Sequence, residues 1–190
     1  RRGLSRPHAG HHGHGYPRSG QPAQRPPRQL FYIAGLGLIG AIADGVGEVR
    51  RAVREQVAHG VDWIKITTTG GVNSRIGAGL GRQLFDDEVK ALVDTAHLYK
   101  KKVAVHAHGD DGINAALAAG ADSIEHGTML TDESIKLFKK AGAYYVPTLS
   151  TVNGYIARLQ ADPNAYPPDV LAKVKWRIGV TGKSLEKAYP

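Results

Sequence analysis

The feature that most constrains the fold of this chain is a regular alternation of short apolar runs with amphipathic, helix-like stretches. From Asp44 onward each strand-like run is followed by apolar residues at helical spacing. Strands separated by helices form βα units on a parallel sheet. The same pattern is typical of a doubly wound sheet and of a (β/α)8 barrel, so the positions of the polar residues must decide between them.

Four strands are predicted from apolar, β-branched runs that end in glycine or polar residues. They cover residues 62–67, 103–108, 123–126 and 144–148. The helices between them are recognised by apolar residues at helical spacing, by acidic or Thr residues at the start and by glycine at the end. They cover residues 46–59, about 86–99, 111–119, about 131–141 and a last segment from about 169. Asp86 and Thr131 are the expected N-caps of the second and fourth of these helices.

Residues 1–30 differ from the rest of the chain. They are rich in Gly, Pro, His and Arg and contain only two Leu residues, so we expect a flexible or loop-like segment before a folded domain at 31–190. Residues 1–28 hold six Arg and no acidic residue, whereas the rest of the chain holds 19 basic and 17 acidic residues. Most of the net charge of +8 therefore lies in residues 1–28, and we expect no specific nucleic-acid partner.

Cysteine is absent, so a metal would have to bind through nitrogen and oxygen ligands. No apolar run reaches the roughly 18 residues of a membrane span. The longest apolar stretch, around residues 33–42, is broken by glycines and is not expected to be a secretory signal. These observations predict a cytoplasmic protein with no membrane partner.

Three polar residues stand at or near the carboxyl ends of consecutive predicted strands: Lys65, His106 and His126. A single strand-end histidine is more often structural than a ligand. A lysine inside a buried strand needs a carboxylate partner, a Schiff base or conversion to a carbamate, because burying an isolated ammonium is costly. In a barrel these strand ends form the active-site face, so the three residues together favour a functional site and the barrel.

His108 lies two residues after His106, so both side chains should point to the same side of the strand. For His108, a role in binding substrate or in orienting metal ligands is weighed equally with a purely structural role.

Four segments resemble the amidohydrolase superfamily, in the branch of the Xaa-Pro dipeptidases and imidazolonepropionase-like hydrolases. They are GVDWIKITTTGGV (60–72), KVAVHAHGD (102–110), DSIEHGT (122–128) and YYVPTLS (144–150). The resemblance extends over roughly residues 35–185 and implies a (β/α)8 metal-dependent hydrolase barrel, present here as about strands four to seven.

The resemblance further implies a centre with one or two divalent metal ions, expected to be zinc. Lys65, carboxylated on its amine, would bridge the metals, and His106 and His126 would bind one of them. The metals would lower the pKa of a water molecule and polarise an amide carbonyl. The implied reaction is hydrolysis of an amide C–N bond in a dipeptide or N-acyl amino acid, with a cyclic amide as the alternative substrate.

The chain departs from the family pattern in two places. The His-x-His of the first barrel strand and the Asp of the eighth are absent from the 190 residues, so no catalytic base is assigned. We therefore expect a fragment of an enzyme; the rival interpretation is an inactive scaffold that binds a ligand or partner. A partial barrel would expose strand edges, which favours self-association into a homo-oligomer.

Members of the family often carry a Gly-His-Gly loop that reaches the active site, and Gly13-His14-Gly15 is the nearest match. The resemblance thus implies a substrate-binding role for His14. The alternative is an incidental His-rich tract that binds metal nonspecifically.

Overall fold

The computed structural model of the chain describes residues 30–32, 40–74 and 79–189. Its centre is a four-stranded parallel sheet whose strands lie side by side in chain order. The strands are β3 (Trp63–Thr67), β4 (Lys102–Ala107), β5 (Ser123–His126) and β6 (Tyr144–Val146). All four were predicted from the sequence, with bounds that differ by at most two residues.

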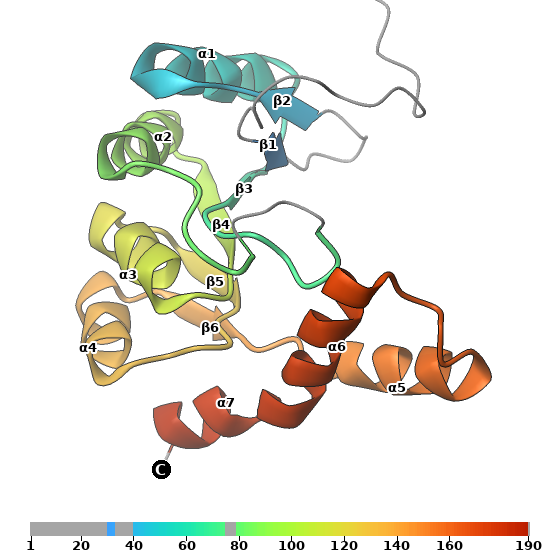
Figure 1. Cartoon of the computed structure of the whole chain (residues 1–190). Helices are drawn as coiled ribbons and strands as arrows, with labels where there is room; N and C mark the ends of the chain where they lie inside the picture. The colour runs from blue at the N-terminus through green and yellow to red at the C-terminus, as the bar shows by residue number, and fades with distance from the viewer. Residues whose placement is uncertain (1–29, 33–39, 75–78, 190) are drawn as a thin grey trace, which may run out of the picture.

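Four helices form a layer on one face of this sheet (Figure 1). They are α1 (Gly45–Ala58), α2 (Asp86–Leu98), α3 (Asp110–Ala119) and α4 (Asp132–Ala141). Each follows or precedes a strand in βα order, as the apolar periodicity predicted. Asp86 is the first residue of α2 rather than its cap, because Phe85 is the N-cap and its backbone N–H donates to the Glu88 carboxylate at 2.8 Å. The predicted cap of α4 is confirmed, since Thr131 accepts a hydrogen bond from the Ser134 backbone.

The two faces of the sheet separate apolar from polar side chains. Along β3 and β4, every second residue points to the helices and is fully buried, as the period of two in a strand requires. The intervening residues are half-buried on the opposite face, where Lys65 is in register with Ala104 and Thr67 with His106. The large side chains on the helix side are Ile64, Ile66, Val103, Val105 and Ile124.

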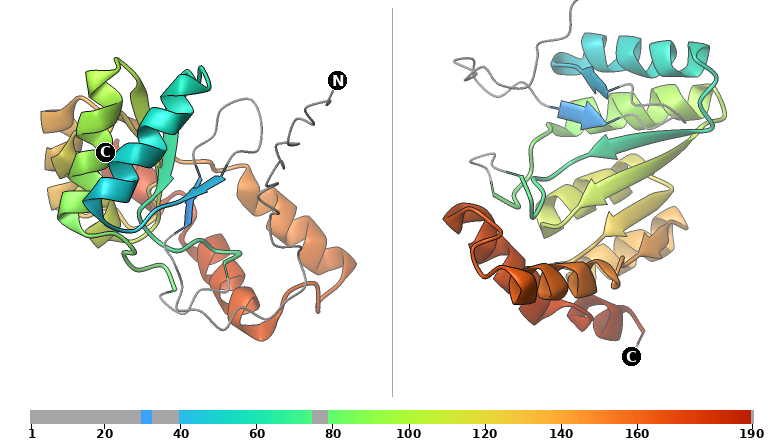
Figure 2. Two further views of the ribbon diagram at one scale, coloured as in Figure 1. Left: turned by 90° about the horizontal axis from the view of Figure 1, so that it is seen from above. Right: turned by 90° about the vertical axis from the view of Figure 1, so that its right-hand side faces the viewer.

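Three further helices follow β6, namely α5 (Thr151–Ala161), α6 (Pro168–Val180) and α7 (Lys183–Ala188). The second view of Figure 2 shows α6 near the end of the sheet toward which the strands point. A small second core joins α6 to the loop after β3 through Val72, Val170 and Val174. The sequence predicted α6 but not α5, of which only Val152 is buried.

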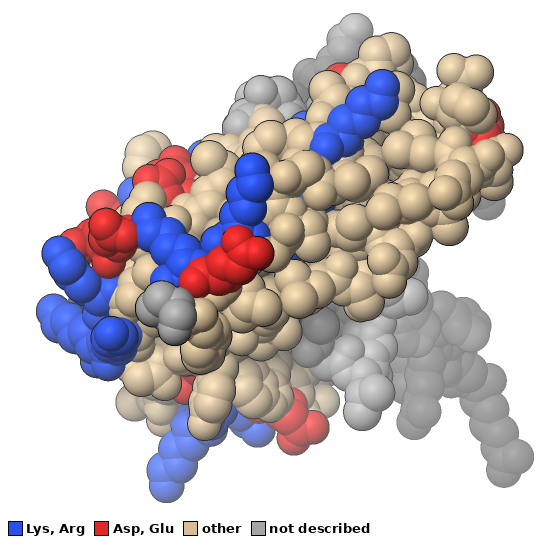
Figure 3. Space-filling model, turned by 90° about the horizontal axis from the view of Figure 1, so that it is seen from below, with Lys and Arg blue, Asp and Glu red and all other residues tan. Residues whose placement is uncertain are grey.

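Two short strands, β1 (Leu30–Tyr32) and β2 (Gly40–Ile42), pair antiparallel before α1. Among the helices described, none has the length and apolar character needed to cross a membrane. On the face seen in Figure 3, basic side chains are mixed with acidic ones and do not form one basic patch.

Candidate metal centre

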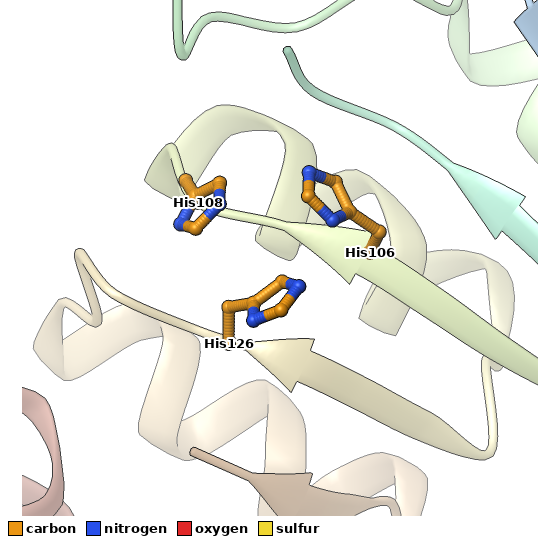
Figure 4. A group of neighbouring side chains, drawn as sticks. All are labelled: His106, His108 and His126. Atoms are coloured by element: carbon orange, nitrogen blue, oxygen red, sulfur yellow. The ribbon is translucent and has the colours of Figure 1, made fainter. Parts of the chain in front are cut away.

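Three histidines meet at the carboxyl ends of β4 and β5 (Figure 4). The ring centroid of His106 lies 4.9 Å from that of His108 and 4.7 Å from that of His126. The rings of His108 and His126 are stacked, with centroids 4.8 Å apart. One ligand nitrogen from each residue lies within 4.8 Å of the other two, a spacing that suits a shared metal ion. We call these three residues the histidine cluster.

Strand periodicity brings His106 and His108 together. His106 occupies the half-buried face of β4, and His108 follows two residues later, so both side chains point the same way. The sequence predicted this shared side, and the short centroid distance confirms it.

His126 reaches the cluster because its backbone leaves the regular strand conformation. It is in register with Ala107, which is buried on the helix side, so an extended backbone would turn the imidazole away from His106. Instead His126 has a φ of 74°, in the left-handed region that a residue with a side chain rarely adopts. Such strain persists where surrounding contacts hold it and is common at functional sites.

Glycine is required immediately after this histidine. Gly127 also has a positive φ, of 47°, and a Cβ there would lie 2.5 Å from the Tyr145 ring. The Tyr145 hydroxyl donates to the Gly127 carbonyl at 3.1 Å, which ties β6 to the turn after β5. This packing holds the turn that redirects His126.

Two threonine hydroxyls hold the imidazoles of the histidine cluster. Thr128 Oγ1 lies 2.8 Å from Nδ1 of His108, and Thr148 Oγ1 lies 2.6 Å from Nδ1 of His126. Thr148 itself has a φ of 48°, so both partners of the second pair have left-handed backbones. With Nδ1 engaged, each ring has its Nε2 left for another partner. These threonines were not singled out in the sequence, although each stands in a segment that carries the family resemblance.

The third imidazole presents an atom that fits a metal directly. Nε2 of His106 is buried and has no hydrogen-bond partner in the part of the chain that the structure describes. Buried polar atoms are nearly always satisfied, so such an atom indicates a missing partner. Its lone pair, next to two further imidazoles, matches the nitrogen ligands that zinc prefers.

All three imidazoles are neutral at pH 7. Burial lowers the pKa of His106 to about 4, helped by the Lys65 charge and opposed by a backbone hydrogen bond with Gly70. Burial also lowers the pKa of His108 to about 2 and that of His126 to about 3, and neighbouring positive charges act in the same direction. Because only neutral imidazole can bind a metal, the cluster needs no deprotonation before binding.

Lys65 lies on the same sheet face, near the histidine cluster. Its charge contributes to lowering the pKa of both His106 and His126. Burial lowers the pKa of Lys65, and the nearby Glu125 carboxylate opposes this shift. Within the described residues, the Lys65 side chain has no hydrogen bond and no ion pair. An amine that burial makes easier to deprotonate is a suitable nucleophile for carbon dioxide.

The structure thus brings together four of the five residues that the sequence proposed for the site: Lys65, His106, His108 and His126. The fifth, His14, lies outside the described residues, as does most of the segment 1–30 that was expected to be flexible or loop-like.

The sequence model of the amidohydrolase family matches residues 23–178. Ochratoxinase of Aspergillus niger is 41% identical over 116 residues, which cover 61% of this chain and 24% of that protein. An uncharacterized protein of Mycobacterium tuberculosis is 35% identical over 138 residues, covering 73% of this chain and 35% of the relative. The chain therefore spans between 24% and 35% of the length of these curated relatives.

Solved structures show the same fold. An Xaa-Pro dipeptidase with bound methionine has a TM-score of 0.72 and 41% identity, over 77% of this chain and 36% of that one. A prolidase in complex with N-methylphosphonate-L-proline has a TM-score of 0.71 and 36% identity, over 80% and 36% of the two chains. The match confirms the predicted α/β fold, which corresponds to part of a TIM-barrel amidohydrolase.

Proposed function

Because the chain belongs to the amidohydrolase family, we propose that it carries part of the active site of a metal-dependent hydrolase that cleaves an amide C–N bond. A dipeptide or an N-acyl amino acid is the proposed substrate, with a cyclic amide as the alternative. Relatives of similar fold bind methionine and a phosphonate analogue of proline, which supports a peptide-like substrate. The observation that carries the proposal is the buried Nε2 of His106, which has no hydrogen-bond partner among the described residues and lies close to two further imidazoles.

We assign His106 and His126 as metal ligands and zinc as the metal. Lys65 joins them as a carbamate, formed when its neutral amine adds to carbon dioxide and releases a proton. The carbamate replaces a buried cation with an anion that has two ligand oxygens. When bound, the metal would supply Lewis-acid polarisation of the amide carbonyl and a water of lowered pKa.

His108 is assigned to the substrate side of the centre. Its ring is stacked on His126, and its Nδ1 is engaged by Thr128. The backbone N–H of His108 donates to Thr69 Oγ1 at 2.9 Å, which fixes the residue between the ends of β3 and β5. The spacing also permits His108 to act as a third nitrogen ligand, and metal analysis of a His108→Ala variant distinguishes the two roles.

The proposal is tested by elemental analysis of the purified, tag-free chain after incubation with zinc and bicarbonate. We expect near-stoichiometric zinc in the chain and its loss in a His106→Ala, His126→Ala double variant. A matched control replaces His59 and His97, two exposed histidines near helix ends, and should keep its zinc. Equal zinc in all three proteins would place the metal elsewhere and refute the assignment.

Lys65 is tested separately by loading with 13C-labelled bicarbonate. A carbamate carbon resonance should be present in the chain and absent from a Lys65→Met variant. An inactive binding scaffold remains the alternative function. It would be favoured if zinc binds as expected but a protein completed with the missing barrel strands hydrolyses neither dipeptides nor cyclic amides.

A further inference from the structure

Helix α6 places two positive side chains, Lys173 and Arg177, one turn apart beside the histidine cluster. The Lys173 ammonium donates to the Gly71 carbonyl at 3.1 Å and also to the Ser74 carbonyl. At the opposite edge of the sheet, just after β6, Arg177 Nη2 donates to the Pro147 carbonyl at 3.2 Å. The helix thus spans from the loop after β3 to the end of β6, across the carboxyl ends of the strands.

Both anchor points adjoin the histidine cluster. A Cβ on Gly71 would lie 3.4 Å from Cε1 of His106, so the carbonyl that holds Lys173 belongs to a residue packed against that ring. Pro147 precedes Thr148, the residue whose hydroxyl contacts His126. The two cations are therefore anchored to residues that adjoin the cluster.

Arg177 is buried and has no counter-charge among the residues that the structure describes. Only 3% of the residue is exposed, and the structure shows one hydrogen bond from a guanidinium that has five N–H donors. No described carboxylate forms an ion pair with Arg177 or with Lys173. Burial lowers the pKa of Arg177, although Tyr145 and Tyr155 oppose the shift. A buried cation is usually paired, so an unpaired one next to a proposed active site indicates a ligand with a negative charge.

We propose that Lys173 and Arg177 form a binding site for the free carboxylate of the substrate, on the α6 side of the histidine cluster. The inference rests on the proposed function, because a dipeptide or N-acyl amino acid carries a carboxylate one carbon away from the amide nitrogen. The planar guanidinium matches a carboxylate with two parallel hydrogen bonds, and the ammonium adds a point charge. The site would select substrates with a free carboxyl terminus over amides and esters.

Binding of two probes that differ only in this charge tests the proposal. N-acetyl-L-proline and N-acetyl-L-prolinamide are titrated by calorimetry into the full chain, both zinc-loaded and zinc-free. The zinc-free arm removes any direct contact between carboxylate and metal. We expect the acid to bind at least about tenfold more tightly than the amide in both forms, as for a hydrogen bond to a charged group.

Variants assign the preference to α6. Arg177→Met should abolish the preference for the acid, Lys173→Met should reduce it, and Lys175→Met, which removes an exposed charge from the same helix, should leave it unchanged. Arg177→Lys retains the charge without the planar fork and should keep part of the preference. Thermal unfolding of each variant shows whether the fold is retained, and Arg177→Lys provides the test if Arg177→Met does not fold.

Three results would overturn the inference. The first is equal binding of the acid and the amide, which includes the case that neither binds. The second is a preference for the acid that survives in Arg177→Met, and the third is competition by acetate as strong as that by N-acetylproline. The first two leave no carboxylate site on α6, and the third indicates a general anion site. Zinc content is measured on the same samples. Loss of the acid preference with normal zinc refutes this inference alone, whereas an acid preference without zinc binding refutes only the proposed function.

Discussion

The two faces of the β3–β6 sheet carry opposite kinds of side chain. The face toward α1–α4 holds fully buried aliphatic residues such as Ile66 and Ile124, whereas the other face holds Lys65, His106 and Glu125, all half-buried. Along β3 and β4 the two kinds of residue alternate, so the same strand backbone positions both the core side chains and the ionisable side chains. The first face supplies the apolar contacts of the core, and the second supplies ionisable groups held in a partly desolvated environment.

Because the two faces differ in this way, substitutions on one face should change a different property of the protein from substitutions on the other. Residues on the helix face should alter the free energy of unfolding and leave the intrinsic metal affinity of the folded protein unchanged. Residues at the strand ends should alter metal affinity and pH response at little cost in stability at neutral pH.

The largest effect should be acid destabilisation of the zinc-free protein. The pKa values of His106, His108 and His126 are lowered in the folded state, so the unfolded chain binds more protons below its ordinary histidine pKa of 6.5. Stability is therefore fully present above pH 6.5 and is lost as the pH falls toward the folded-state values, by up to about 4 kcal/mol per pH unit for three histidines.

Urea unfolding between pH 7 and pH 5, with a chelator present, measures this slope. A His108→Gln variant should reduce it by about a third, because one of three neutral histidines is removed. An unchanged slope in that variant would show that other groups cause the acid response.

The next largest effect should come from the helix face. Ile124→Ala removes a fully buried side chain from β5, two residues before His126, and should lower the free energy of unfolding by about 2–5 kcal/mol. Zinc affinity, measured by competition with a chromophoric chelator where the variant is folded, should stay within a factor of about three. A much larger loss of affinity would mean that the two faces are energetically coupled.

Thr148 tests the strand-end region by itself. Thr148→Ser keeps the hydroxyl that contacts His126 and should preserve zinc affinity. Thr148→Gly relieves the positive φ but removes the hydroxyl, so zinc affinity should fall by about 10- to 100-fold while stability is retained or increased. If the glycine variant binds zinc normally, the hydroxyl does not orient His126.

The smallest effect should be that of Thr131→Ala. It removes the side-chain cap of α4, away from the histidine cluster, and should cost about 1 kcal/mol of stability with no change in zinc affinity. Thermal unfolding and the same competition assay measure both quantities. A change in zinc affinity would extend the coupled region to the helix layer.

The sequence predicted the strands, helices α1–α4 and α6, and the convergence of Lys65, His106 and His126, because these follow from local periodicity and from the geometry of parallel strands. It did not reveal α5, whose apolar Val152, Tyr155, Ile156 and Leu159 have helical spacing but are interrupted by Gly154. Most of that helix is exposed, so its apolar pattern is weak.

Other features arise from contacts distant in the chain. The left-handed backbone of His126 is held by Tyr145 in β6 and by Thr148 shortly after that strand, and no spacing rule predicts it. Arg177 comes near the histidines only because α6 packs on the loop after β3 through the small second core. Its segment reads as an ordinary amphipathic helix, in which an arginine normally lies at the surface.

The conformation of His126 has a consequence for protein engineering. At a φ of 74°, glycine would be less strained than histidine, so replacement of His126 by glycine is a substitution that a thermostability screen would favour. Laboratory selection for heat resistance alone should therefore remove the imidazole and with it the proposed metal ligand. A library built from this chain needs a metal-binding or activity readout at every round to retain residue 126.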